Sequence, residues 1–308
     1  MPNQLLLAAA RSQHARAAVT RVPVTRRVVD RFVAGEHVDD ALAASTRLLE
    51  RGLTVTIDHL GEATTGREQV DQASAAYVTL LARLAAAGYA DRAEVSVKLS
   101  ALGQALPHDG GRLALDAAAT ICAAAALAGT TVTIDMEDHT TVDSTLSVVR
   151  ALRSDFPWVG VAIQSCLYRS EADCADLAYA GSRIRLVKGA YAEPVSVAHR
   201  SKSGVDLAYA RCLETLMVGA GRPMVATHDP ALIAHAHTLA TRHGRERQTY
   251  EYQMLYGIRA DAQRRLAAAG NQVRVYLPYG TDWYPYFMRR LAERPANIAF
   301  FLRSLVHR

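Results

Sequence analysis

The sequence predicts an α/β protein, a (β/α)8 barrel of the TIM type preceded by an N-terminal helical arm. Short β-branched runs alternate with Ala- and Leu-rich segments of helical length, which is typical of parallel βαβ units. There are eight such runs, and the residues from the first run onward fit the roughly 250 residues of such a barrel. The sequence DHLGE follows the first run, and the lack of G-x-G-x-x-G there disfavours the competing open dinucleotide-binding sheet.

The elements follow one another in a regular order. The strand candidates are residues 53–58, 94–100, 131–137, 159–165, 183–189, 223–227, 249–255 and 272–278. The helix candidates between them are residues 72–87, 111–128, 141–154, 206–220, 230–243 and 260–270. Residues 1–50 are predicted to be helical, most clearly over 39–51, and to form an arm packed on the barrel. The predicted domains are therefore this arm, 1–50, and the barrel, 51–308.

The composition excludes several classes of protein. The chain has 308 residues, of which 50% are hydrophobic and 21% charged, as in ordinary globular domains. No run of about 18 uncharged apolar residues predicts a membrane span, and the N-terminal apolar run lacks the basic segment of a signal peptide. Four dispersed cysteines and eleven histidines show no metal-ligand spacing or disulfide framework, so we expect no metal and a cytoplasmic location. The net charge of +5 is scattered, which disfavours nucleic acid as a partner but permits peripheral contact with an anionic membrane.

Polar side chains gather where the predicted strands end, which in such a barrel is the edge that carries active sites. They are Asp58, His59, Lys98, Asp135, Glu137, Asp138, Gln164, Arg185, Lys188, Tyr191, Thr227, His228, Asp229, Glu251, Gln253, Arg274 and Tyr276. A lysine inside a barrel must be paired or must meet a ligand. Lys98 therefore has three interpretations: a structural pair with Asp135 or Glu137, a Schiff-base nucleophile, or a cation for a substrate carboxylate.

The segment DWYPYFMRRLAER predicts a helix after the last strand. Tyr286, Arg289, Arg290 and Glu293 fall on one face of that helix. This face is either a solvated Arg–Glu ladder, worth little to stability, or a clamp for an anion, because arginine binds carboxylates with two parallel hydrogen bonds. With Lys98, the two arginines would place three cations around one small anion.

The motifs in this order resemble those of the proline dehydrogenase family, in its monofunctional bacterial form. They are SVKLSALG (96–103), IDMED (134–138), VAIQS (161–165), RLVKGAY (185–191), ATHD (226–229), YEYQMLYG (250–257), VRVYLPYG (273–280) and YFMRRLAER (286–294). The resemblance implies a distorted (β/α)8 barrel that binds FAD non-covalently and oxidises L-proline to 1-pyrroline-5-carboxylate, with electrons passed to a membrane quinone. We expect no aldehyde dehydrogenase or DNA-binding domain in this chain and assign no oligomeric state.

The same resemblance implies roles for individual residues. Three cations would hold the proline carboxylate: Lys98, Arg289 and Arg290. Four side chains would wall the proline ring: Tyr276, Tyr286, Leu186 and Tyr191. The residues implied for catalysis are Arg185, near the flavin N5 nitrogen, Asp135 and Tyr276. The residues implied for FAD binding are Arg185, Gln164, Val187, Lys188, Gly189, Ala190, Lys202, Thr227, His228, Glu293 and Phe300. The sequence departs from the family pattern at Val205, where a threonine is usual.

Two other functions compete with this one. A Schiff-base aldolase would use Lys98 or Lys188 as its nucleophile, and trapping of a carbonyl substrate by borohydride would reveal it. A non-catalytic barrel that binds nucleic acid would show salt-sensitive DNA binding. The position of the basic residues within strands, and not along a surface stripe, disfavours the second of these.

Overall fold

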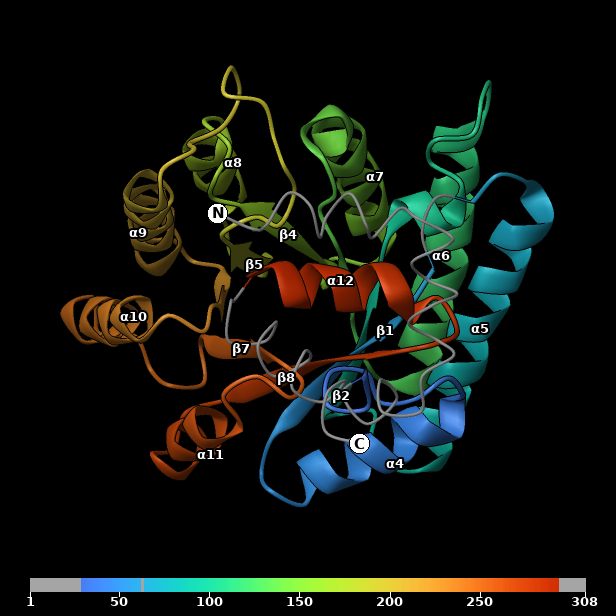
Figure 1. Ribbon diagram of the computed structural model, residues 1–308, viewed down its shortest axis with the longest axis horizontal. Coiled ribbons are helices and arrows are strands. Elements are labelled where there is room, and N and C mark those ends of the chain that lie inside the picture. The colour runs from blue at the N-terminus through green and yellow to red at the C-terminus, as the bar shows by residue number, and fades with distance from the viewer. Residues whose placement is uncertain (1–28, 62–63, 294–308) are drawn as a thin grey trace, which may run out of the picture.

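Eight parallel strands close into a barrel in the order in which they occur along the chain, and β8 pairs with β1 (Figure 1). This is the predicted fold. The computed structural model describes residues 29–61 and 64–293. The strands are β1 (Thr54–His59), β2 (Ala93–Val97), β3 (Val132–Ile134), β4 (Gly160–Gln164), β5 (Arg183–Val187), β6 (Arg222–Ala226), β7 (Glu251–Leu255) and β8 (Val273–Tyr279).

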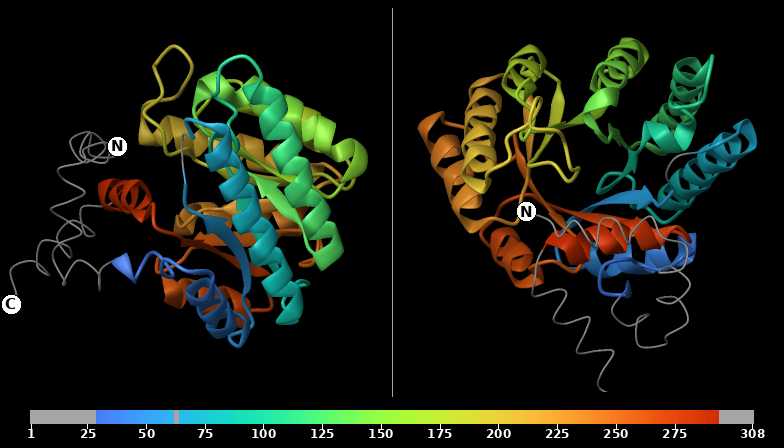
Figure 2. Two further views of the ribbon diagram at one scale, coloured as in Figure 1. Left: turned by 90° about the vertical axis from the view of Figure 1, so that its right-hand side faces the viewer. Right: turned by 45° about the horizontal axis from the view of Figure 1, so that its top comes forward.

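Most of the helices surround the barrel on its outside (Figure 2). The described helices are α4 (Val38–Leu49), α5 (Arg67–Ala86), α6 (Gly110–Ala128), α7 (Val142–Asp155), α8 (Ser170–Leu177), α9 (Lys202–Val218), α10 (Pro230–Arg242), α11 (Ala260–Ala268) and α12 (Trp283–Glu293). The sequence argument missed α8, because its eight residues, SEADCADL, show little apolar periodicity. It also placed the start of α5 five residues late, because the first turn of that helix is almost entirely polar.

Two residues predicted inside strands lie immediately after them. β2 ends at Val97, and Lys98 precedes a short 3-10 helix, η1 (Leu99–Leu102), whose first turn begins with a hydrogen bond to the Lys98 carbonyl. β3 ends at Ile134, although the Asp135 amide still donates to the Val97 carbonyl at 2.9 Å. Both side chains thus emerge where the backbone leaves the sheet, at the carboxyl edge of the barrel.

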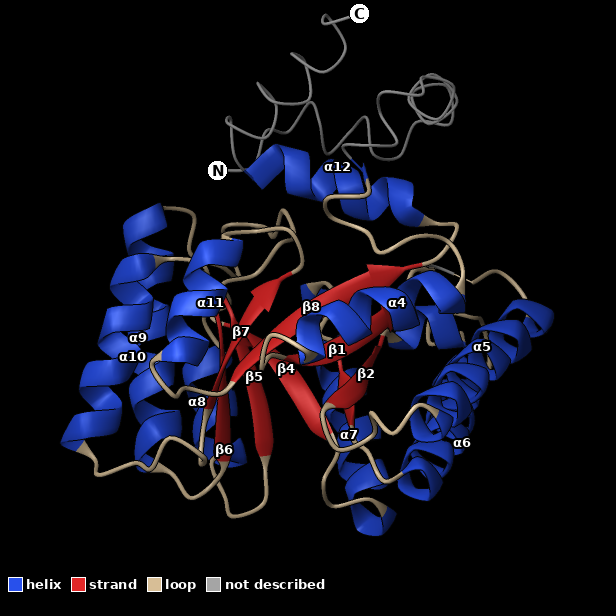
Figure 3. Cartoon of the chain, turned by 90° about the horizontal axis from the view of Figure 1, so that it is seen from below, coloured by secondary structure: helices blue, strands red, loops and turns tan. Residues whose placement is uncertain are grey.

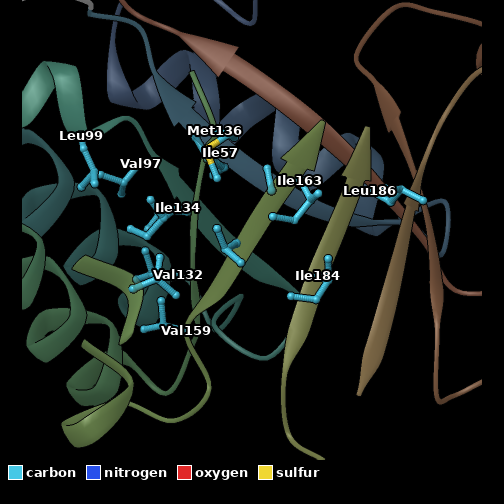
Figure 4. Packing of buried hydrophobic residues seen from close by; sticks show 14 of the residues in the cluster. Ile57, Val97, Leu99, Val132, Ile134, Met136, Val159, Ile163, Ile184 and Leu186 are labelled. Atoms are coloured by element: carbon cyan, nitrogen blue, oxygen red, sulfur yellow. The ribbon is translucent and has the colours of Figure 1, made fainter. Parts of the chain in front are cut away.

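The hydrophobic core lies between the strands and the helices. Val132, Ile134, Val159, Ile163 and Ile184 are buried there (Figure 4). Because successive strand residues point to opposite faces, the alternate positions point into the bore of the barrel. Many of those positions carry polar or charged residues, among them Glu94, Arg185 and Glu251, so apolar burial in the outer layer stabilises the fold while ionic contacts dominate in the bore.

The last helix lies across the carboxyl end of the barrel (Figure 3). A second hydrophobic cluster joins it to the segment that precedes α4. In that cluster the rings of Phe32 and Phe287 lie 6.2 Å apart, and both side chains are buried. The described part of the arm, residues 29–50, packs on α12 through this cluster and on the main core through Ala41, Ala44 and Leu48 of α4.

One helix in the described part of the chain, α6, is long and apolar enough to cross a membrane by length and composition alone. Its buried residues, among them Leu113, Ala118 and Ile121, belong to the main hydrophobic core. A core helix of a barrel passes the same test of composition, so α6 is weak evidence for a membrane span.

Candidate active site

Lys98 lies at the bottom of the site in a buried ionic cluster. Its Nζ is 2.6 Å from Asp58 Oδ2, 3.5 Å from Asp135 Oδ2 and 3.4 Å from the Tyr276 hydroxyl. The predicted pairing with Asp135 is therefore correct. The shorter contact, with Asp58, was missed, while Glu137 accepts hydrogen bonds from Ser100 instead. The β1–β2 register pairs Asp58 with Ser96, which puts Lys98 two residues further on the same face.

Arg185 is held on several sides within the bore. Its Nη1 lies 2.5 Å from Asp135 Oδ1 and 2.7 Å from Ser96 Oγ, and its Nε donates to Gln253 Oε1 at 2.6 Å. The guanidinium also lies 5.2 Å from the centre of the Tyr276 ring. Because the side chain is only 4% exposed, these contacts fix its position.

Asp135 and Tyr276 form a hydrogen-bonded pair with opposite pKa shifts. The Tyr276 hydroxyl donates to Asp135 Oδ2 at 2.6 Å. Burial alone would raise the pKa of Asp135, but the charges of Arg185 and Lys98 outweigh burial and lower it. Burial and the neighbouring Asp135 carboxylate raise the pKa of Tyr276 well above its usual value. Near neutral pH the pair is therefore a carboxylate and a protonated phenol.

The face of α12 predicted to carry the clamp is mostly buried. Tyr286 and Arg290 are buried, and the Arg290 guanidinium lies 5.0 Å from the centre of the Tyr286 ring. Arg289 is half-buried. The solvated-ladder interpretation is therefore wrong for Tyr286 and Arg290. The side chain of Glu293 and the whole of Phe300 lie outside the described residues.

A pocket opens beside the carboxyl end of β5, between that strand and the start of α9. Lys188, Gly189, Ala190, Tyr191 and Lys202 are among the residues that line it. Gly189 has a φ of +111°, and a Cβ at this position would overlap the Cys166 sulfur. Glycine is therefore required here both by the backbone and by the close approach of the neighbouring strand end.

Both lysines of this pocket are ion-paired. Lys188 Nζ lies 2.5 Å from Asp206 Oδ1 and 3.0 Å from Asp229 Oδ2. Lys202 pairs with the same Asp206 carboxylate and belongs to the first turn of α9. The lysine charges are thus held close to a helix N-terminus by two shared carboxylates.

The remaining predicted residues also lie near the carboxyl ends of their strands. Gln164 ends β4 and donates from Nε2 to the Met136 carbonyl at 3.2 Å. His228 Nε2 accepts a hydrogen bond from the Leu255 amide at 2.8 Å, and Thr227 is buried next to it in the chain. Val187 is half-buried at the end of β5. Leu186 is fully buried and lies in the main hydrophobic core (Figure 4).

Comparisons with known proteins place this chain in a family. A family model described as "Proline dehydrogenase" matches residues 41–303. The chain is 41% identical over 281 residues to the proline dehydrogenase of Deinococcus radiodurans, covering 91% of this chain and 90% of that protein. It is 39% identical over 282 residues to proline dehydrogenase 1 of Bacillus subtilis strain 168, covering 92% of each.

Solved structures resemble the fold as well. Proline utilization A (PutA) from Bdellovibrio bacteriovorus, in a form inactivated by N-propargylglycine, matches with a TM-score of 0.81 and 25% identity. That match covers 91% of this chain but 34% of the PutA chain, so the protein spans about a third of that larger structure. A PutA variant from Bradyrhizobium japonicum matches with a TM-score of 0.74 and 23% identity, which supports the fold alone.

The parallel barrel, with its charged cluster at the carboxyl ends of the strands, defines a barrel enzyme. The length of the family match, and the sequence identity to relatives over nearly their whole length, show to which family of barrel enzymes the chain belongs. The chain belongs to the proline dehydrogenase family, and it is an oxidoreductase of proline catabolism.

Proposed function

We propose that this enzyme binds FAD and oxidises L-proline to 1-pyrroline-5-carboxylate, with the electrons passed on to a membrane quinone. The observation that carries the proposal is the cluster of Lys98, Asp135, Arg185 and Tyr276 at the carboxyl ends of the strands, beneath α12 (Figure 3). It supplies fixed cations for a carboxylate and an aromatic surface for a small apolar ring.

The residues present fit a bound flavin nucleotide. Arg185 is a buried cation whose Nη1 and Nε are held by Asp135, Ser96 and Gln253, while its Nη2 lies 3.6 Å from Glu94 Oε1 in the bore, so a fixed positive charge lies at the base of the site. The pocket at β5 adjoins the N-terminus of α9, and helix N-termini favour phosphate groups. Its two lysines are held beside that N-terminus by Asp206 and Asp229. Gly189 keeps the pocket wall close to Gln164, because any side chain at that position would overlap its neighbours.

We assign the following residues to FAD: Arg185, Gln164, Val187, Lys188, Gly189, Ala190, Lys202, Thr227, His228, Glu293 and Phe300. Bound FAD would supply the two-electron acceptor for the oxidation. Near it, Arg185 places a cation that is already oriented and desolvated, so negative charge that arrives during the reaction is stabilised without rearrangement.

The substrate is proposed to be held by its two ends. Lys98, Arg289 and Arg290 would bind the carboxylate, which fixes the orientation of the ring. Tyr276, Tyr286 and Tyr191 would exclude water from the ring. Leu186, for which the same role was expected, is fully buried in the main hydrophobic core. The position of α12 across the barrel mouth (Figure 3) supports the convergence of the three cations, which stays a prediction.

The reaction removes a hydride from the ring carbon bonded to nitrogen and a proton from the nitrogen, which leaves a C=N bond. The amine must therefore bind, or become, a free base. Asp135 is a weak proton acceptor, because its pKa is lowered by Arg185 and Lys98 despite burial. We infer that Asp135 orients the Tyr276 hydroxyl and Arg185, and that it is not the final proton acceptor.

The Schiff-base alternative has less support. Lys98 lies between the carboxylates of Asp58 and Asp135, which stabilise the ammonium form, whereas a Schiff-base lysine must react as the neutral amine. Lys188 is likewise paired with Asp206 and Asp229.

A spectrum and a reduction experiment test the proposal. The purified chain should be yellow with bound flavin, and anaerobic L-proline should bleach it and yield 1-pyrroline-5-carboxylate. Reoxidation by a soluble quinone analogue tests the acceptor. A chain that stays colourless after incubation with FAD would overturn the proposal. For location we propose a cytoplasmic enzyme in peripheral contact with the membrane, which vesicles carrying anionic lipid and quinone would test.

A further inference from the structure

The bore beneath the active site contains a buried ion-pair network that reaches up to Arg185. We propose that Gln253 is a positioning residue. Its amide links the fixed carboxylate of Glu251 to the Arg185 guanidinium by hydrogen bonds and thereby determines where that cation lies. The inference rests on the proposed function, because it concerns the cation assigned to the flavin.

The Gln253 amide lies between a cation and an anion. Its Oε1 accepts from Arg185 Nε at 2.6 Å, and its Nε2 donates to Glu251 Oε1 at 2.7 Å. Both residues are on β7, two positions apart, so they share the face that points into the bore. Gln253 is 3% exposed, and water is therefore a poor substitute for either partner.

Glu251 is itself held by charged residues from other strands. Its carboxylate lies 2.8 Å from Arg274 Nε and 3.2 Å from Arg222 Nη2. Arg274 also donates to the Val55 carbonyl of β1 at 2.9 Å. Burial raises the pKa of Glu251, but the charge of Arg274 outweighs this and lowers the pKa, so the anchor stays ionised.

The chemistry of the two partners fixes the orientation of the amide. The guanidinium of Arg185 can only donate, and the carboxylate of Glu251 can only accept. A glutamine satisfies both in one orientation, with its oxygen toward Arg185. A carboxylate in its place would lie against Glu251, and an apolar side chain would leave Arg185 Nε without its acceptor, although Glu251 would keep its contacts with Arg274 and Arg222. Gln253 is thus the neutral spacer that connects a buried cation to a buried anion.

Arg185 is then fixed by contacts on opposite sides of its guanidinium. Asp135 and Ser96 hold Nη1, and Gln253 holds Nε. Without the hydrogen bond to Gln253, the Arg185 guanidinium can rotate about its Nη1 contacts. Its positive charge then moves relative to the flavin proposed to bind above it. The effect should appear in the electrostatics at the flavin and not in the affinity for the proline carboxylate.

The test compares two buried glutamines in the FAD-loaded enzyme. Gln253→Met removes both hydrogen bonds at similar volume. Gln263→Met is the matched control, because Gln263 is equally buried but donates to the Leu255 and Ile258 carbonyls at 3.0 and 2.9 Å. Gln253→Met should lower kcat roughly ten-fold and the flavin midpoint potential by about 30 mV, the equivalent of ten-fold for a two-electron couple. KM for proline should change less than about two-fold, and the control should lower only the melting temperature.

A second variant covers the case in which Gln253→Met fails to fold. Gln253→Asn keeps an amide but is one methylene too short to span both partners, so it should lower the potential in the same direction. Potentials and kcat values equal to those of Gln263→Met would overturn the positioning role alone, while flavin reduction by proline in the wild-type enzyme would still support the proposed function. A wild-type chain without flavin would overturn both.

Discussion

Removal of the Asp58 carboxylate should expose how strongly the bottom of the site depends on paired charges. Asp58→Ala leaves Lys98 with its second carboxylate, Asp135. At an effective dielectric constant of about 20, the contact of 2.6 Å is worth about 6 kcal/mol of attraction and the remaining one of 3.5 Å about 5 kcal/mol. The loss of one partner of a buried pair usually costs about 3–5 kcal/mol. Because Asp135 remains, we expect about 3 kcal/mol.

Thermal unfolding measures this cost directly. At about 2 °C per kcal/mol for a chain of this size, the melting temperature of Asp58→Ala should fall by about 6 °C. A double-mutant cycle with Lys98→Met should show a coupling of about 2 kcal/mol, because the double variant no longer buries an imperfectly paired ammonium.

An exposed pair gives the control. Asp39 Oδ1 lies 2.5 Å from Arg83 Nη2, but the two side chains are 74% and 47% exposed. Asp39→Ala should therefore cost less than about 1 kcal/mol, although the same chemical group is removed. Equal costs for Asp58→Ala and Asp39→Ala, or a cycle that is additive within about 0.5 kcal/mol, would refute the reasoning.

Three further predictions concern binding, acid stability and the cofactor pocket. Arg290→Met should raise KM for proline roughly 10- to 150-fold, as expected for the loss of one charge-assisted hydrogen bond of about 1.5–3 kcal/mol, with little change in FAD content. Steady-state kinetics of this variant and of Arg289→Met would show which arginine binds the carboxylate more strongly. An unchanged KM in both variants would contradict the clamp. Glu94→Gln should flatten the acid side of the stability profile, measured as melting temperature from pH 3 to 7. Burial raises the pKa of the Glu94 carboxyl, but the charges of three arginines outweigh burial and lower this pKa. The ionised carboxylate therefore stabilises the fold fully above about pH 5, and this stabilisation is lost as the pH falls below the pKa of an ordinary glutamate. An unchanged profile would contradict this. Gly189→Ala should weaken FAD retention because the added Cβ meets Cys166, and wild-type FAD content in a folded variant would contradict the pocket assignment.

The order and number of the elements could be predicted because their signals are local. Alternation of β-branched runs with Ala-rich segments indicated all eight strands, and the motifs put the polar residues at the correct edge. The pairing of Lys98 could be predicted only in part. Asp135 was foreseen from strand order, whereas the closer contact with Asp58 depends on how β1 and β2 are staggered, which no local pattern specifies.

The ion-pair network in the bore could not be predicted from the sequence, because it too depends on how distant strands are placed side by side. Glu94, Glu251 and Arg274 are visible as charges within strand candidates. Their partners lie on strands far away along the chain: Arg183 is 89 residues from Glu94, and Arg274 is 219 residues from the Val55 carbonyl to which it donates. Only a closed barrel brings these residues together, because closure makes the first and last strands neighbours.

The contact between the segment before α4 and the last helix has a consequence for how the enzyme is made. Phe32 and Phe287 are about 250 residues apart in the chain, and their packing fastens α12 over the barrel mouth. Because a ribosome delivers the N-terminal partner early and α12 at the end of the described chain, this fastening comes late in synthesis. The barrel with its ionic bore can assemble first, and the proposed flavin pocket stays open from above until the helix with its arginines arrives.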